Sequence, residues 1–282
     1  LSLKGAVSKG MPMPLIAKPG WVIRTKSLLP LIAGTSCELT SARIWTSPWR
    51  SARSEAWASG LILKIRRSSF GAPLYVHAHA LTFFGWAMLY LTQTLLATSG
   101  NIALHKRLGW IAAAWIPLMV VVGTMVVYLS LRRGHTAPFF TPAYFTVMAP
   151  MTVYAFAGMA TAAIMLRRRT DWHKRLQFCA MAGLMGPGFG RILPMPLVMP
   201  HAPLVETVSI LFIPVIAAAV DWRRTGQLHR AWLWGIGALV VVRIVVDLLG
   251  ASPIAGELHA WITAGSPGAA LPPFAYPPMP GG

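Results

Sequence analysis

Three histidines stand directly before basic residues, at the points where three apolar stretches of the chain begin. We call these segments the His-basic boxes: His105-Lys106-Arg107, His173-Lys174-Arg175 and His229-Arg230. A helix start presents unpaired backbone N–H groups and a partial positive charge, so cationic side chains added there favour anions. The boxes therefore predict a site for an anionic lipid headgroup or another phosphate-bearing ligand. The alternative is that the cations only fix membrane topology, while the histidines cap the backbone or meet headgroups.

A second set of histidines lies away from the boxes. His77 and His79 stand near the start of the first apolar stretch, and His201 stands just before the fifth. Histidines on facing helices can ligate haem iron, so a b-type haem electron carrier that uses these three residues, or the box histidines, stays open. The alternative is a set of interfacial histidines without a ligand. No metal site is predicted, because no cluster of Asp, Glu and Cys completes a ligand shell.

Two charged residues fall inside the last apolar stretch. Arg243 and Asp247 are four positions apart, which places them on one face of a helix. A charge at mid-bilayer costs about 2.5–3.5 kcal/mol, so the pair should face the bundle or neutralise itself. One interpretation is a proton or ion relay in a small transporter, and the other is a pair that fixes helix packing. The carboxyl of Glu206 is expected to be an interfacial cap or a partner for Arg191.

The segment Gly186-Pro187-Gly188 interrupts the fourth apolar stretch. Broken helices in transporters expose backbone groups to a substrate, which is the second feature that favours a small transporter. Pro and Gly also kink helices whose neighbours satisfy the freed backbone groups, and that alternative requires no transport.

The candidate residues must be positioned by secondary structure, and the apolar stretches between them predict helices. Six stretches approach or reach the length of about 20 residues that crosses a bilayer: 73–98, 109–131, 142–166, 175–193, 203–220 and 231–249. Backbone polar groups must be satisfied internally in hydrocarbon, and the stretches lack the alternating polarity of a β-barrel. We therefore predict an all-α polytopic transmembrane helix bundle of about six spans, arranged as three hairpins.

Composition agrees with lipid as the solvent. The chain is 55% hydrophobic and 11% charged, whereas a soluble domain carries about 25% charged residues. The formal net charge of +18 resides mostly outside the apolar stretches, with no basic stripe on a soluble element, so nucleic acid is not an expected partner. The partners expected are the lipid bilayer and anionic lipid.

The basic residues also predict an orientation. The loops after the first, third and fifth stretches hold ten Lys and Arg, against three in the loops after the second and fourth. By the positive-inside rule the His-basic boxes face the cytoplasm and both termini face outward. The basic segment at the start of the chain conflicts with this orientation.

Three regions follow from these patterns. Residues 1–72 form a basic leader without sustained periodicity, which we interpret as either a disordered segment or an over-extended start. Residues 73–250 form the transmembrane domain. Residues 251–282 are rich in Pro and Gly and are expected to be irregular. Cys179 is expected to be a small buried residue, and no catalytic motif points to a reaction.

The motifs also resemble a family. His105-Lys-Arg-Leu-Gly-Trp, His173-Lys-Arg-Leu with Gly190-Arg191, and Asp221-x-Arg223 leading to His229 are similar to motifs of uncharacterised proteobacterial multi-pass membrane proteins. The first two motifs also resemble a broader bacterial domain of unknown function. The resemblance covers residues 73–262 and implies a protein of the bacterial cytoplasmic (inner) membrane. It brings no activity, substrate or cofactor.

Overall fold

The structure is a computed structural model that describes residues 71–277 of the chain. This part is helical and contains no strand. Its elements are α2 (Leu74–Thr98), α3 (Ile102–Arg132), α4 (Pro142–Met165), α5 (Thr170–Gly183), α6 (Gly186–Ile192), η1 (Met195–Val198), α7 (Ala202–Thr225), α8 (Arg230–Gly250), α9 (Pro253–Thr263) and η2 (Pro267–Ala270). The predicted all-α transmembrane bundle is confirmed. The predicted leader lies outside the described residues, apart from its last two positions.

The long helices expose apolar side chains. Five helices, namely α2, α3, α4, α7 and α8, are long and apolar enough to cross a membrane, yet only 11–33% of their most apolar windows are buried inside the protein. Large apolar side chains such as Phe84, Val121 and Leu248 point outward. Water would make this surface unfavourable, so hydrocarbon is the solvent that fits it.

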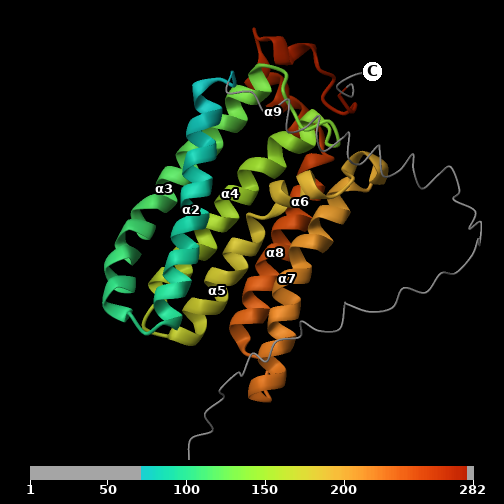
Figure 1. Cartoon of the computed structure of the whole chain (residues 1–282). Coiled ribbons are helices and arrows are strands. Elements are labelled where there is room, and N and C mark those ends of the chain that lie inside the picture. Colours follow the sequence, from blue (N-terminus) through green and yellow to red (C-terminus); the bar gives the residue numbers. More distant parts are fainter. Residues whose placement is uncertain (1–70, 278–282) are drawn as a thin grey trace, which may run out of the picture. The chain divides into compact units, whose positions relative to one another are not determined.

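The fourth predicted span differs from the expectation. It is no continuous helix but α5, of 14 residues, followed by the short α6. At 1.5 Å per residue α5 is about 21 Å long, less than the hydrocarbon thickness. Pro187 was expected to break a helix but lies in the first turn of α6, where a missing N–H costs nothing. Figure 1 shows that α4 ends and α7 begins at opposite ends of the bundle, so α5 and α6 together carry the chain across.

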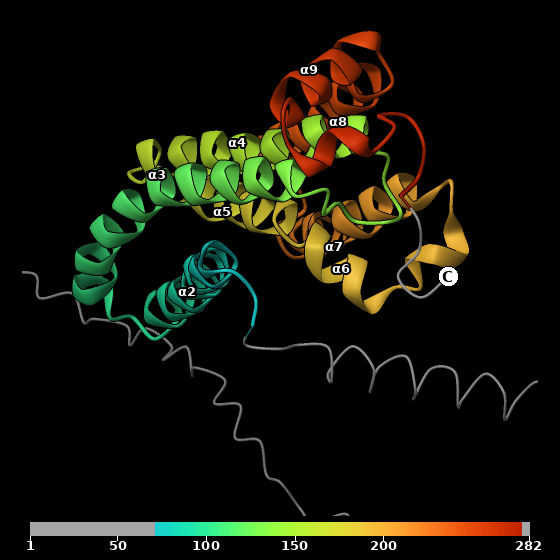
Figure 2. The ribbon, with the colours of Figure 1, turned by 90° about the horizontal axis from the view of Figure 1, so that it is seen from above.

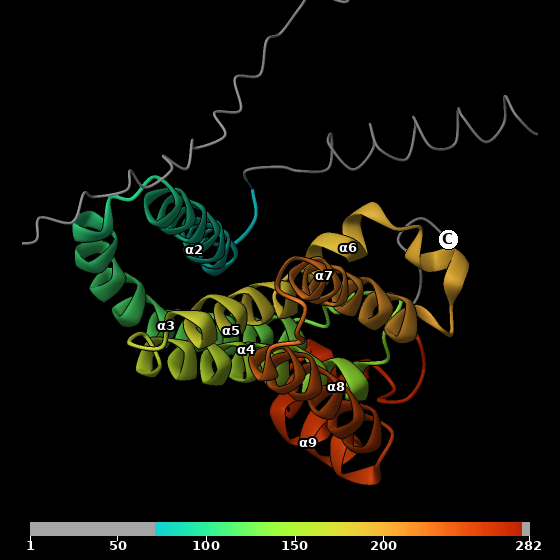
Figure 3. The ribbon, with the colours of Figure 1, turned by 90° about the horizontal axis from the view of Figure 1, so that it is seen from below.

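Helix α4 holds the bundle together, because it packs against α3, α5, α8 and α9. Seen from below in Figure 3, α4 and α5 lie side by side, with α3 beyond them on one side and α8 on the other. The core between these helices is built around Trp86, Met119 and Phe156. Cys179 is fully buried, as predicted, and a Cβ placed on Gly235 would come within 2.5 Å of its Sγ. Glycine therefore lets α8 approach α5 closely.

The tail after residue 251 was expected to be irregular, and this prediction is wrong for residues 253–270. It forms α9 and η2, and Figure 2 shows α9 packed beside α4 and α8 at one end of the bundle. His259 of α9 is buried beside Thr146 of α4, and Arg132 Nη1 donates to the carbonyl of Ile262 at 3.0 Å. Ser252 and Pro253 are a residue pair that favours a helix start. Pro253 opens this helix and Gly265 follows its end, while Gly256 lies inside it, where a Cβ would meet the Phe274 ring.

Candidate functional site

The three His-basic boxes meet at one end of the bundle. The loops α2–α3, α4–α5 and α7–α8 all lie at this end, opposite α9 (Figure 1). The rings of His105 and His173 have centroids 6.3 Å apart, and the rings of Trp172 and His229 have centroids 5.7 Å apart. Boxes separated by more than fifty residues in the sequence therefore form one surface. We call it the cationic end.

The box histidines have two different local roles. His105 Nδ1 lies 3.2 Å from the carbonyl oxygen of Gln93 in α2, and His173 Nδ1 lies 2.8 Å from that of Ala163 in α4. A carbonyl only accepts, so both Nδ1 atoms carry hydrogen and both Nε2 atoms remain acceptors in the neutral rings. His229 instead caps α8, because its Nδ1 accepts from the N–H of Ala231 at 3.1 Å.

Arg175 was predicted to bind an anion, and its surroundings argue against that role. Its side chain is buried, and its Nε and Nη2 lie 2.8 and 2.7 Å from Asp221 Oδ2. Its Nη1 donates to the carbonyl and the Oδ1 of Asp171. Trp232 Nε1 donates to the same Asp221 oxygen at 2.8 Å. Arg175 therefore connects α5 to α7 and α8, and its charge is already matched.

Lys174 is paired as well, but at the surface. Its Nζ lies 2.9 Å from Asp171 Oδ1, and both side chains are about three-fifths exposed. The hydrogen bonds from Lys174 and Arg175 hold the pKa of the Asp171 carboxyl below its usual value. The second box thus contributes little uncompensated charge to the cationic end.

The remaining cations of this end are exposed and have no acidic partner among the described residues. They are Lys106, Arg107, Arg168, Arg169, Arg223, Arg224 and Arg230. Arg167 is exposed too, and its guanidinium lies 5.7 Å from the ring centre of Trp110. Asp171 and Asp221 are the acids found here in the described part of the chain. The surface therefore carries a large excess of positive charge.

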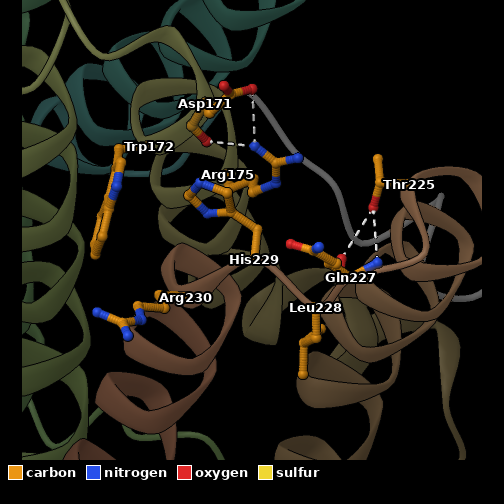
Figure 4. A pocket seen from close by; sticks show the side chains of 8 residues that line it. All are labelled: Asp171, Trp172, Arg175, Thr225, Gln227, Leu228, His229 and Arg230. Atoms are coloured by element: carbon orange, nitrogen blue, oxygen red, sulfur yellow. Dashed lines mark hydrogen bonds and ion pairs between the residues drawn. The ribbon is translucent and has the colours of Figure 1, made fainter.

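A hollow of about 460 Å³ opens between two of the loops. Figure 4 shows Trp172 and Arg230 on one side, Thr225 and Gln227 on the other, and His229 between them. Thr225 accepts from and donates to the backbone of Gln227, across a turn that Gly226 makes with a φ of +73°. Arg230 is the exposed, unpaired cation at this hollow.

The histidines of the opposite end do not form an evident ligand set. The ring of His79 packs on Phe83 with centroids 4.3 Å apart. His201 is exposed and precedes the first turn of α7. His77 lies in the first turn of α2. Within residues 71–277 no group of three or more His, Cys, Asp and Glu residues could hold a metal ion.

The predicted pair inside α8 is present. Arg243 Nε donates to Asp247 Oδ2 at 2.7 Å, so the two charges neutralise each other along one helix face. The sequence did not reveal the partners from other helices. Tyr144 of α4 donates to Asp247 Oδ1 at 2.9 Å, and Arg243 Nη1 also donates to the Pro203 carbonyl and the Thr207 hydroxyl of α7.

The expected pair of Glu206 with Arg191 is not formed. Arg191 Nη1 donates to the carbonyl of Pro187 in its own helix at 2.8 Å. The carboxyl of Glu206 packs against Gly186 instead, where an added Cβ would collide with Oε1.

Comparisons with protein-family models, with curated proteins and with solved structures found no match to this chain.

Proposed function

We propose that this protein is a multi-pass protein of the bacterial cytoplasmic membrane that binds anionic headgroups, or another phosphate-bearing ligand, on its cytoplasmic face. The excess of Lys and Arg in the three loops supports this orientation through the positive-inside rule. The resemblance to proteobacterial membrane proteins supports the choice of membrane.

The observation that carries the proposal is the gathering of exposed, unpaired cations from three separate loops. Such residues lie at the height of lipid headgroups when the helices span a bilayer, and each is worth about 1 kcal/mol near an anionic surface. The helix starts of α3 and α8, capped by the side chains of Asn101 and His229, bring the positive ends of two helix dipoles to the same surface. The hollow beside Arg230 offers a phosphate group one exposed guanidinium and the side chain of Gln227.

The test compares lipid retention between matched variants. The variant Lys106→Gln/Arg107→Gln/Arg230→Gln removes three unpaired cations, and Arg132→Gln/Arg133→Gln/Arg191→Gln removes three cations at the opposite end. Each protein is purified from membranes that contain phosphatidylglycerol, and the bound lipids are counted by native mass spectrometry. We expect the first variant to lose most bound anionic lipid and the second to retain it. Equal retention in both variants would refute the proposal.

A second measurement separates lipid from a soluble ligand. Protein in phosphatidylcholine nanodiscs is titrated with inorganic pyrophosphate, and with short-chain phosphatidylglycerol in a parallel series. Binding of the lipid alone identifies a headgroup site within the bilayer surface. Binding of pyrophosphate with similar strength, lost in the first variant, identifies a phosphate site open to the cytoplasm.

His105 and His173 favour a second candidate function, a b-type haem electron carrier. Their rings are 6.3 Å apart, and each Nδ1 is fixed by a backbone carbonyl, which leaves both Nε2 atoms as ligands. A carbonyl that orients the second ring nitrogen is the usual support of a metal-bound histidine. Two buried amide oxygens belong to residues close to these histidines in the chain or in space, and neither accepts a hydrogen bond from the described residues. One belongs to Gln93, whose carbonyl binds His105, and the other to Gln177, four residues after His173.

An optical spectrum of the purified protein tests this candidate. A Soret band that is lost in His105→Ala and in His173→Ala would support it. His229→Ala is the matched control, because that histidine caps a helix through Nδ1. Purified protein with no Soret band and no extractable haem would exclude the haem carrier and leave the anion-binding proposal unchanged.

A further inference from the structure

A second group of ionisable residues lies at the end of the bundle opposite the cationic end. It joins Tyr144 of α4, Thr207 of α7 and the pair Arg243 and Asp247 of α8 through the hydrogen bonds described above. Charged residues within transmembrane helices are costly and mark functional sites by default. We call this group the outer cluster.

Glu206 belongs to the outer cluster by position. It lies three residues after Pro203, on the same side of α7, and the Pro203 carbonyl accepts from Arg243 Nη1. Its carboxyl occupies the space that Gly186 leaves free where α5 gives way to α6. No hydrogen bond among the described residues reaches this carboxylate. Glu206 therefore contacts the discontinuity of the fourth span and lies within electrostatic reach of Arg243 in α8.

The charges of the outer cluster do not balance. It holds one guanidinium and two carboxyl groups, and Asp247 already receives the Nε hydrogen of Arg243 and the hydroxyl hydrogen of Tyr144. The other charged or titratable groups nearby are the Arg191 side chain, bound to its own helix, and the exposed His201 before α7. Arg191 keeps its charge, but its side chain is exposed and bound to its own helix. An ionised Glu206 would thus add a second negative charge with Arg243 as the cation that acts on it.

We infer that Glu206 is a proton-binding site, which holds one proton in the outer cluster and exchanges it with the outer face while Arg243 and Asp247 stay ion-paired. Protonation removes the surplus negative charge without disturbing the pair. Glu206 lies four residues into α7, about 6 Å from the helix start, so the outside water is near. Water access near a helix end also makes exchange feasible. This site is independent of the anion-binding proposal, because it lies at the other end of the bundle.

Infrared difference spectroscopy of the protein in nanodiscs tests the inference. Spectra recorded between about pH 5 and about pH 9 should show the C=O band of one protonated carboxylic acid that is lost on raising the pH. Glu206→Gln should abolish this band. The matched control Glu257→Gln, at an exposed acid of α9, should retain it.

Two further variants keep the result interpretable. Gly186→Ala, whose Cβ would displace the carboxyl, should shift the midpoint of the band and leave its amplitude. Asp247→Asn should retain the band, because the inferred proton belongs to Glu206 and Asp247 is paired with Arg243. A band that survives in Glu206→Gln, or the absence of any titrating band in the wild type, would overturn the inference. A band that responds to Na⁺ and not to pH would overturn it as well, because the bound cation would then be a metal ion.

Discussion

The two ends of the bundle each contain an arginine bound to a carboxylate, but the surroundings of the two arginines differ. Arg175 is buried and meets Asp171 and Asp221, Lys174 also pairs with Asp171, and the Trp232 indole donates to Asp221, so two cations face two carboxylates. Arg243 is one-fifth exposed, meets Asp247, and acts electrostatically on the carboxyl of Glu206, which has no hydrogen-bond partner among the described residues. The charges around Arg175 are matched, so this group accounts for the packing of α5 against α7 and α8. The outer cluster around Arg243 has a second carboxyl group, whose charge must be matched by a ligand or a proton.

The comparison predicts its largest effect at Arg175. Arg175→Met would leave Asp221, which is only 22% exposed, with the Trp232 N–H and no countercharge. Breaking a buried pair by removing one partner costs about 3–5 kcal/mol of unfolding free energy. Denaturation in mixed micelles measures this loss.

The matched control is Lys174→Met, one residue away. Its pair with Asp171 is exposed on both sides, so the expected loss is about 0–1 kcal/mol. Similar losses in the two variants would show that Arg175 does not connect α5 to α7 and α8, and the contrast between the two ends would fail.

The spans and the Arg243–Asp247 pair could be predicted because their signals are local. A run of apolar residues is read directly, and a spacing of four fixes a helix face. The Arg175–Asp221 pair could not be predicted in the same way. Forty-six positions separate these residues, and their contact depends on how α5 and α7 pack. The surplus of cations at one end was predicted, but which cations are already neutralised depends on tertiary structure.

Helix α9 was missed although the sequence carried a signal for it. Ser252 and Pro253 begin the helix and Gly265 follows its end, with a φ of +65°. The overall Pro and Gly content of the tail obscured these positions. The local roles of the box histidines, in contrast, could not be predicted from the sequence of the boxes. Their spacing to the basic residues is alike, yet His173 donates to the preceding helix and His229 caps its own. The difference arises because His173 is the fourth residue of α5, whereas His229 immediately precedes the first residue of α8.

A smaller effect is expected at the outer cluster. Arg243→Met would leave the Asp247 carboxylate without its countercharge, and we expect a loss of about 2 kcal/mol at neutral pH, because the pair is partly exposed. Adding Asp247→Asn to this variant should recover about half of the loss, because the unpaired charge is removed while the hydrogen bonds of Arg243 to Pro203 and Thr207 stay lost. The same micelle denaturation reports both values.

Adding Glu206→Gln to Arg243→Met sharpens the result. If Glu206 already carries a proton, this second substitution should recover almost nothing, because no charge is removed. Recovery as large as that from Asp247→Asn would show that Glu206 is ionised and would count against the proton-binding site.

The smallest effect concerns Asp171 at the cationic end. Hydrogen bonds from Lys174 and Arg175 lower the pKa of this carboxyl in the folded protein, whereas an unfolded Asp titrates near about 3.9. A lowered folded pKa contributes stability that is fully present above about pH 4 and is lost as the pH falls through the folded pKa. Unfolding of the wild type and of Asp171→Asn, compared between about pH 6 and about pH 3, should therefore converge in acid. Because this side chain is exposed, the difference at neutral pH should be small, and curves that diverge in acid would mean that Asp171 is stabilised in its protonated form.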